Sequence, residues 1–334
     1  MVKISVLDQS VAIADVSHDR SIRGTIELAR HCEKLGYNRF WVSEHHNHPT
    51  ILGTAPEILM AAIAQTTQTI RIGSAGVMLP HYSPYKVAEQ FRVLDAIAPG
   101  RIDLGLGRAP GSDGKTAMAL NPNGHINTQN FPINVRDLIA WVSNVPLIDN
   151  HPYKSLKAYP VSNTMPEIWM LGSSDYGAQI AAHFGIPFCF AHFITEGIGL
   201  SRAVRLYREN FQPSERYPNP VLSACVWALT AETKERSKFL FMPRAHWKLK
   251  RTRGELGPLI NPTDATNYPY SSSDQDFISD LCEHALIGSP DSVAHQLCSL
   301  AKNNTIDEIV ILTWAYDEKD RRRSYELLAK ELIA

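Results

Sequence analysis

Cysteine is scarce in this chain of 334 residues, and neither sign of charge is in excess. The five cysteines are scattered and form no CxxC pair, which favours a reduced, cytoplasmic protein whose thiols act as small hydrophobic groups. Lys and Arg total 33 against 34 Asp and Glu, so we expect no nucleic-acid partner and no membrane surface. No apolar run approaches the length of a membrane span, and the run in "MVKISVLDQS" is too short for a signal peptide.

Short apolar runs separated by helical patterns are present instead. Several of the runs are almost continuously apolar, which is typical of parallel strands buried on both faces. Eight runs have the character of strands: Ile4–Leu7, Arg39–Ser43, Ile70–Leu79, Arg101–Gly107, Glu167–Gly172, Pro187–Ala191, Val221–Thr230 and Glu308–Thr313. Their alternation with helices predicts an α/β protein, and eight such strands favour a closed (β/α)8 TIM-like barrel.

The helices between the strands have recognisable ends. One runs from a capping Asp19 to Gly36, and another has Ser83 as N-cap, Pro84 at its first position and Gly100 after its end. The segment from Ser173 to Gly185 and the one that begins "SPDSVAHQL" follow the same pattern. These ends support the predicted alternation of strands and helices.

Two connections are too long for simple loops, and they predict insertions after strands 4 and 7. They are Arg108–Pro166 and Ala231–Asp307. The second contains a polar, Pro-containing stretch within 252–276, which is either a lid over the catalytic end of the barrel or a surface insertion. We find no repeat and no linker, so we expect one domain over residues 1–334.

Three histidines and a carboxylate follow the second strand, in "WVSEHHNHPT". Barrel enzymes hold their active sites at this end of the strands. Alternation along an extended chain would place His46 and His48 on one face and His45 on the other. A metal site would need ligands from other strand ends, where only His183 and His192 are candidates and carboxylates are few, so we expect no metal. For His46 and His48 we favour a solvated loop, and for His45 a functional site.

Small residues interrupt the third strand, and a lone cation follows the fourth. Ser74, Ala75 and Gly76 suit either a flat ligand held close to the backbone or a packing layer of small side chains. Arg108 could hold an anionic group. The neighbouring glycines have the spacing G-x-G-x-x-x-G with Pro110 inside it, which excludes a dinucleotide fingerprint.

The fifth strand leads directly into a helix, in "WMLGSSDYGAQIAAHFG". Ser173 and Ser174 at that helix N-terminus form either a phosphate cradle or a simple helix cap. Asp175 in the first turn would oppose a bound phosphate unless its side chain points away.

These stretches, in this order, resemble the bacterial luciferase-like flavin monooxygenases, and the chain is most similar to small single-chain members. The resemblance covers nearly the whole chain. It is carried by "FWVSEHH", "RIGSAGVMLPHYSPYKVAEQFRVLDAIAPGRIDLGLGRAPG", "WMLGSSDYGAQIAAHFGIPFCFAHF" and "GSPDSVAHQL".

The resemblance implies roles for particular residues. It implies that His45 is the catalytic histidine beside the flavin, and that a non-proline cis peptide joins Ala75 and Gly76 behind the flavin ring. It implies that Arg108 is a basic residue of the flavin site. It also implies that the turn Gly172, Ser173, Ser174, with Gly177 in the helix, binds the phosphate. Luciferase has a reactive cysteine where this chain has Gly107, so we do not expect light emission.

The resemblance further implies an FMN-dependent monooxygenase that oxygenates a small organic substrate such as an aldehyde or ketone. Reduced FMN would come from a separate NAD(P)H:flavin reductase. By analogy with the family, we expect a homodimer through the helices after strands 2 and 3, Thr54–Thr66 and Pro84–Ala98. Three other functions stay open: a deazaflavin-dependent oxidoreductase, a non-catalytic flavin-binding protein and a metallohydrolase. An imidazole titrates near neutrality, which suits His45 to proton transfer at the flavin.

Overall fold

The computed structural model describes residues 2–109 and 111–333. It contains the strands β1 (Lys3–Asp8), β2 (Arg39–Val42), β3 (Arg71–Ser74), β4 (Val77–Met78), β5 (Ile102–Gly107), β6 (Glu167–Gly172), β7 (Phe188–Phe190), β8 (Leu222–Thr230), β9 (Leu286–Gly288) and β10 (Glu308–Leu312). The sheet order is β10-β1-β2-β3-β5-β6-β7-β8-β9, and β10 also pairs with β8. The strand pairing therefore closes the sheet into the predicted parallel (β/α)8 barrel.

Helices connect the strands. They are α1 (His18–Lys34), α2 (Pro56–Ala64), η1 (Leu79–His81), α3 (Pro84–Ile97), α4 (Gly114–Leu120), α5 (Gly124–Gln129), α6 (Phe131–Ser143), α7 (Asp175–Phe184), α8 (His192–Thr195), α9 (Leu200–Asn210), α10 (Lys234–Thr252), α11 (Pro262–Asn267), α12 (Ser272–His284), α13 (Pro290–Asn303) and α14 (Glu318–Leu332). None of the helices in the described part of the chain has the length and apolar character needed to cross a membrane.

Most element boundaries match the predictions to within one or two residues, with three corrections. The third predicted strand is split into β3 and β4 around Ala75 and Gly76. The three-residue strand β9 was not predicted. Asp19 does not cap α1, because Ser17 is the N-cap and Asp19 lies in the first turn, where its charge is favourable.

The chain divides into two compact units. The first unit comprises Met1–Phe40, His48–Gly53 and Ala224–Ala334. The second comprises Trp41–Asn47 and Thr54–Ser223. The expectation of one domain over the whole chain stays a prediction.

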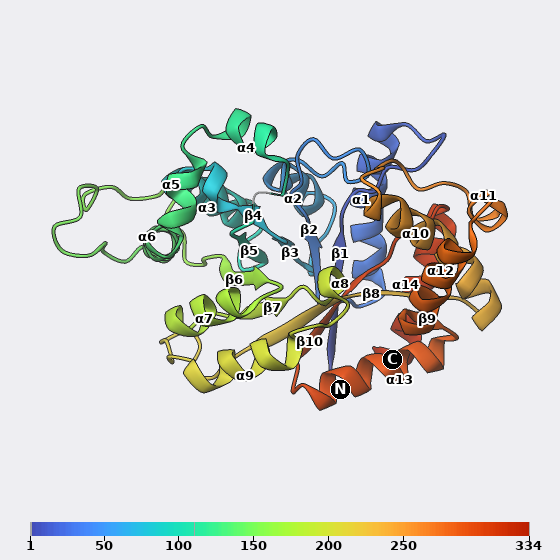
Figure 1. Cartoon of the computed structure of the whole chain (residues 1–334). Coiled ribbons are helices and arrows are strands. Elements are labelled where there is room, and N and C mark those ends of the chain that lie inside the picture. Colours follow the sequence, from blue (N-terminus) through green and yellow to red (C-terminus); the bar gives the residue numbers. More distant parts are fainter. Residues whose placement is uncertain (1, 110, 334) are drawn as a thin grey trace. The chain divides into compact units, whose positions relative to one another are not determined.

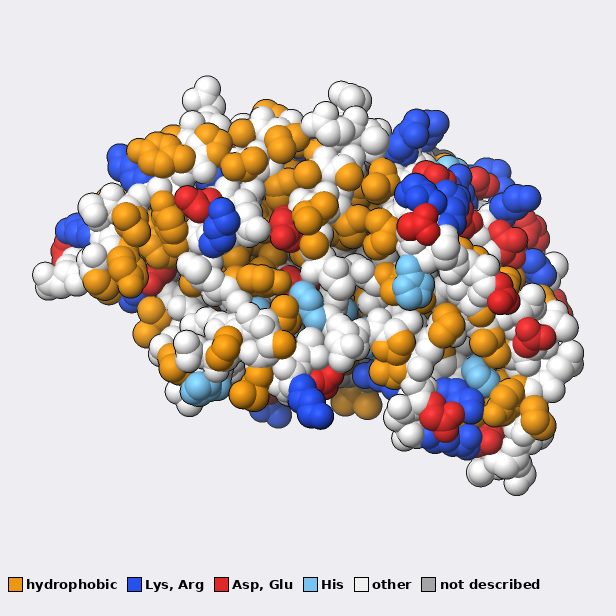
Figure 2. Space-filling model, turned by 90° about the horizontal axis from the view of Figure 1, so that it is seen from above, with side chains coloured by type: hydrophobic (Ala, Val, Ile, Leu, Met, Phe, Trp, Pro, Cys, Tyr) orange, Lys and Arg blue, Asp and Glu red, His pale blue; other side chains and the backbone are white. Residues whose placement is uncertain are grey.

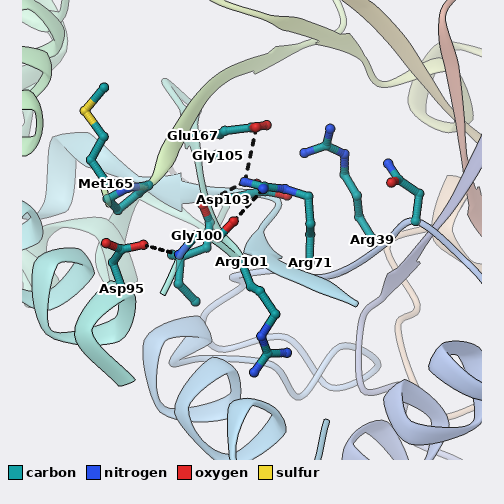
Figure 3. Close-up of polar contacts among 12 residues, drawn as sticks. Arg39, Arg71, Asp95, Gly100, Arg101, Asp103, Gly105, Met165 and Glu167 are labelled. Carbon is teal, nitrogen blue, oxygen red and sulfur yellow. Dashed lines mark hydrogen bonds and ion pairs between the residues drawn. The ribbon is translucent and has the colours of Figure 1, made fainter. Parts of the chain in front are cut away.

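A layer of polar side chains lies among the N-terminal parts of strands in the second unit (Figure 3). Asp103 of β5 is fully buried, and Arg71 of β3 binds one of its oxygens at 2.6 and 2.9 Å. Arg71 also pairs with Glu167 of β6 at 3.3 Å, and the Trp41 indole donates to Asp103 at 2.9 Å. The buried charge of Asp103 thus has its partners. Because these contacts join side chains of β2, β3, β5 and β6, the layer fixes the register of these four strands.

A similar layer lies in the first unit, around Glu308 at the start of β10. Its buried carboxylate accepts hydrogen bonds from the Ser5 hydroxyl of β1, from Asn38 at 2.8 Å and from Arg39 at 3.0 Å. These bonds tie the start of β10 to β1 and to the start of β2.

The segment 252–276 of the first unit is joined to the loop that follows β1. Leu259 is buried, its N–H donates to Ala12 at 2.9 Å, and its carbonyl accepts from Ala14 at 2.8 Å. The Gly257 carbonyl accepts from the Thr50 hydroxyl at 2.6 Å. The segment is therefore anchored to the rim of its unit, and its motion as a lid stays a hypothesis.

The insertion after β5 has a different character. Neither α4 nor α5, all of whose residues are described, fully buries a side chain. Met118, Ile126 and Ile133 are 67%, 44% and 48% exposed. Hydrophobic side chains accordingly gather over the part of the surface formed by α4 to α6 (Figure 2).

Candidate active site

A buried carboxylate organises the loop that follows β2. Glu44 is 1% exposed, and its Oε1 accepts hydrogen bonds from His46 Nε2 and the Tyr82 hydroxyl, both at 2.8 Å. Its Oε2 accepts from the Met78 N–H at 3.1 Å. Burial and the neighbouring Glu44 charge raise the pKa of Tyr82 above its ordinary value, so its hydroxyl stays protonated as a donor. The loop is thus held to the segment after β3.

The other two histidines of this loop have structural partners. Asn47 has a φ of +50°, which breaks the alternation assumed for an extended chain. The His46 side chain is 11% exposed because it binds Glu44. His48 Nδ1 accepts from the N–H groups of Thr50 and Ile51, each at 3.1 Å. The expectation of a solvated loop for His46 and His48 is therefore wrong, and alternation does not assign their faces.

His45 is half-buried and lies three residues beyond the end of β2. Backbone hydrogen bonds bring neighbouring loops to this place. The N–H of Ala75 donates to Val42 at 2.7 Å, and the N–H of His46 donates to Gly111 at 3.2 Å. The loops after β2, β3 and β5 therefore meet around His45.

The small residues between β3 and β4 are required by close packing. The peptide bond between Ala75 and Gly76 is cis, as the resemblance implies. A Cβ at Gly76 would lie 2.6 Å from Leu171 Cδ1 and 2.7 Å from the Gly105 carbonyl oxygen. The Ser74 hydroxyl donates to that carbonyl at 3.0 Å and accepts from the Gly105 N–H at 3.1 Å. Packing alone thus accounts for Gly76 and Gly105, because the Leu171 side chain and the neighbouring backbone leave no room for a Cβ at either position.

The turn between β6 and α7 has unused donors. Ser174 is the N-cap of α7 but does not cap it through its side chain, and the Ser173 and Ser174 hydroxyls make no hydrogen bond to any described residue. The first N–H groups of a helix also lack intrahelical partners. A Cβ at Gly177 would meet Gly172 Cα at 3.5 Å and Phe188 at 3.3 Å, so this position has little spare room.

A cation lies over the first turn of the same helix. The Arg108 guanidinium is 4.2 Å from the centre of the Tyr176 ring, and Arg108 makes no ion pair within the described chain. Asp175 instead pairs with Arg202 of α9 at 2.8 Å, and α7 and α9 lie side by side (Figure 1). The carboxylate that would oppose an anion is therefore neutralised by a neighbouring helix.

Sequence reasoning missed several of these residues. Tyr176 and Arg202 gave no signal, because their partners are distant in the sequence. Tyr82 gave none either, although Glu44 was visible beside the histidines. Together, Arg108, the two serine hydroxyls and the α7 N-terminus offer one positive charge and several donors, which suits a phosphate group.

No group of three or more His, Cys, Asp or Glu side chains in the described ranges is placed to hold a metal ion. His192, considered as a metal ligand from the sequence, follows β7 and is half-buried, and burial lowers the pKa of its imidazole. The donors around the N-terminus of α7 suit an anionic group rather than a metal ion. The five cysteines are all free thiols.

A family model described as luciferase-like monooxygenase matches residues 2–131. A luciferase-like monooxygenase of Escherichia coli (strain K12) is 37% identical over 327 residues, which cover 98% of this chain and 96% of that protein. The chain belongs to the luciferase-like monooxygenase family. This family assignment confirms the predicted resemblance.

Further members have more specific names. An N-acetyl-S-alkylcysteine monooxygenase of Bacillus subtilis (strain 168) is 34% identical over 335 residues, covering 100% of this chain and 99% of that protein. The structure of apo-MsnO8 is 33% identical, with a TM-score of 0.91 and coverage of 100% and 99% of the two chains.

A more distant structure shares the fold alone. It is the oxygenating constituent of 3,6-diketocamphane monooxygenase from Pseudomonas putida in complex with FMN. It is 20% identical to this chain, with a TM-score of 0.73 and coverage of 99% and 98%.

Proposed function

We propose that this member of the family is an FMN-dependent monooxygenase that receives reduced FMN from a separate NAD(P)H:flavin reductase. The observation that carries the proposal is the anion site of the second unit. Arg108 over Tyr176, the free hydroxyls of Ser173 and Ser174, and the N-terminus of α7 have the chemistry that the flavin phosphate needs. The structure of 3,6-diketocamphane monooxygenase in complex with FMN supports the choice of flavin.

Each site residue expected from the sequence has a place in this proposal. Gly172, Ser173, Ser174 and Gly177 would form the phosphate turn, and Ala75 and Gly76 would lie behind the flavin ring. Reduced FMN, when bound, would supply two electrons, so that one atom of O₂ enters the substrate and the other leaves as water. His45 would hold or transfer the proton, because an imidazole exchanges protons near neutral pH. Glu44 would keep the His45 loop in place.

The sequence supports the proposal of a separate reductase. The glycines around Gly105 and Gly107 do not have dinucleotide spacing, so they do not form the fingerprint that would bind NAD(P)H. The substrate is proposed to be a small organic molecule. Names among the relatives point to thioethers as well as to the aldehydes and ketones expected from the sequence, since one of them is an N-acetyl-S-alkylcysteine monooxygenase.

We also propose a homodimer through α2 and α3. A groove of about 460 Å³ lies on these helices. Ile58, Val93 and Ile97 line it and are 66%, 47% and 42% exposed. Lys86 and Glu89 lie beside them, so that two copies of the surface could pair both apolar groups and opposite charges.

Flavin binding by the Arg108→Leu variant tests the proposed site. We expect the affinity for FMN to fall about 10–100-fold, as for the loss of one charge-assisted bond, and the affinity for riboflavin, which lacks the phosphate, to stay unchanged. Arg205→Leu, an exposed arginine of α9, is the control of equal charge. Calorimetric titration of both variants with FMN, riboflavin and a deazaflavin cofactor gives the answer. Equal losses for FMN and riboflavin would contradict a phosphate contact.

The reaction itself is tested by mixing the protein with reduced FMN and O₂ and recording flavin absorbance. We expect bound flavin to be reoxidised with kinetics that differ from those of free flavin. Identical kinetics despite tight FMN binding would leave a non-catalytic flavin-binding protein. Preference for the deazaflavin over FMN would replace the monooxygenase with a hydride-transferring oxidoreductase.

A further inference from the structure

A cluster of aromatic and polar side chains lies at the C-terminal ends of three barrel strands in the first unit. Gln9 directly follows β1, Trp314 follows β10, and Trp227 lies near the end of β8. The Thr313 hydroxyl donates to the Ala228 carbonyl at 2.7 Å, which places Trp227 and Trp314 at neighbouring levels. Barrel enzymes bind substrates at this end of the strands.

Helix α10 brings a buried cation to the cluster. The Arg244 guanidinium lies 4.3 Å from the Trp227 ring centre and 5.7 Å from that of Trp314. Arg244 and Trp227 are each 5% exposed. Phe241 and Trp247 of the same helix pack on the two indoles at 5.1 and 4.9 Å between ring centres. The positive charge is therefore held among rings, where a low dielectric strengthens its attraction for an anion.

The remaining polar groups of the cluster are also donors. The Trp314 indole donates to Gln9 Oε1 at 3.1 Å. Because an indole N–H can only donate, the Gln9 oxygen must face it, and the Gln9 NH₂ is left as a donor. The Trp227 Nε1–H is buried and has no hydrogen-bond partner in the described part of the chain. Such an unpartnered buried donor is costly unless a ligand satisfies it.

We infer that this cluster binds the carboxylate of the substrate, so that the oxygenated molecule is a small organic acid with an apolar remainder. A carboxylate offers two oxygens that accept bonds and cannot donate any, which complements the guanidinium, the indole N–H and the amide NH₂. The indole faces suit an apolar chain next to the acid group. The inference rests on the proposed function only in taking the bound acid to be the substrate, because the acid site itself requires no flavin.

Binding of small acids to the flavin-free protein tests the inference. The probes are phenylacetate and octanoate, each compared by calorimetry with its amide, which has the same shape but no charge. We expect the acids to bind at least tenfold more tightly than the amides. In Arg244→Met the affinity for the acids should fall about 10–100-fold, and that for the amides should change little.

Two further variants separate recognition from packing. Arg251→Met is the matched control, because Arg251 lies on the same helix and stacks on Trp247 at 5.5 Å but is exposed. Gln9→Glu keeps the acceptor for Trp314 and replaces the NH₂ donor with a carboxylate oxygen, so it should repel the acids even if Arg244→Met fails to fold. Circular dichroism melting of each variant reports its folding.

Several results would overturn the inference. They are the absence of acid binding, equal affinity for acids and amides, and an unchanged acid preference in Gln9→Glu or in folded Arg244→Met. Inorganic phosphate that displaced the acids as well as they displace each other would replace a substrate site with a general anion site. FMN titration of the same variants is scored separately, so a failure of the acid site is distinguishable from a failure of the flavin site.

Discussion

Replacing Glu44 should reveal how strongly the His45 loop depends on one buried carboxylate. In Glu44→Ala the donors of His46, Tyr82 and Met78 lose their acceptor together. Hydrogen bonds to a charged group contribute about 1.5–3 kcal/mol each, and removing one partner from a buried ionic network costs about 3–5 kcal/mol. Because part of the space fills with water or relaxes, we expect the free energy of unfolding to fall by about 3–5 kcal/mol.

Glu44→Gln should be much milder, for a reason that the geometry supplies. The glutamine oxygen can accept from the Met78 N–H while its NH₂ group donates to the other two partners. The Tyr82 hydroxyl can turn to accept, and His46 can change tautomer to present Nε2 as an acceptor. We therefore expect a loss below about 1.5 kcal/mol.

Urea unfolding followed by circular dichroism measures both variants. The control is Glu209→Ala, at an exposed position of α9, for which we expect a change within about 0.5 kcal/mol. A Glu44→Ala protein as stable as the control would refute the network. If Glu44→Gln lost as much stability as Glu44→Ala, the negative charge of Glu44, and not the hydrogen bonds that it accepts, would hold the loop.

Three further predictions concern catalysis, pH and assembly. His45→Ala should retain FMN affinity while product formation falls about 10²–10⁴-fold, the usual contribution of a positioned acid or base; unchanged turnover in a product assay would remove His45 from the mechanism. Arg20 first, with Arg322, lowers the pKa of Glu27 from 4.5 to about 2, so its stabilisation is present above pH 4.5 and is lost as the pH falls towards 2. Thermal unfolding at pH 7 should therefore show Glu27→Gln to be slightly less stable than the parent, by less than about 1 kcal/mol because the side chain is 39% exposed. A stability difference that persists at pH 2 would contradict this role of the Glu27 charge. Val93→Glu on α3 should convert a dimer to a monomer in light scattering, whereas Ile126→Glu, similarly exposed on α5, should not; a dimeric Val93→Glu protein would exclude this interface.

The parts of the fold that were predicted are those with a strong local signal. The buried parallel strands appear in the sequence as apolar runs, and Ser174 and Gly185 mark the ends of α7 as expected. The strand β9 has only three residues, too few for a pattern. The split between β3 and β4 depends on the backbone at Ala75 and Gly76, which side-chain hydropathy does not encode.

The site was predicted less completely, because its contacts join distant segments. The sequence and the resemblance together pointed to His45, Arg108 and the serines. The pairing of Asp175 with Arg202 and the stacking of Arg108 on Tyr176 are set by the packing of α7, α9 and the loop after β5. The histidine loop was misread because a single residue, Asn47, leaves the extended conformation.

The two ends of β5 have different roles in the second unit. Asp103 anchors the buried ionic layer near the start of this strand, and Arg108 follows its end. At about 3.3 Å per residue the two positions are roughly 16 Å apart, beyond the range at which substitutions usually influence each other. Residues near Arg108 can therefore be exchanged without disturbing the ionic layer around Asp103. A variant in which that layer has first been stabilised should tolerate more substitutions at the Arg108 end.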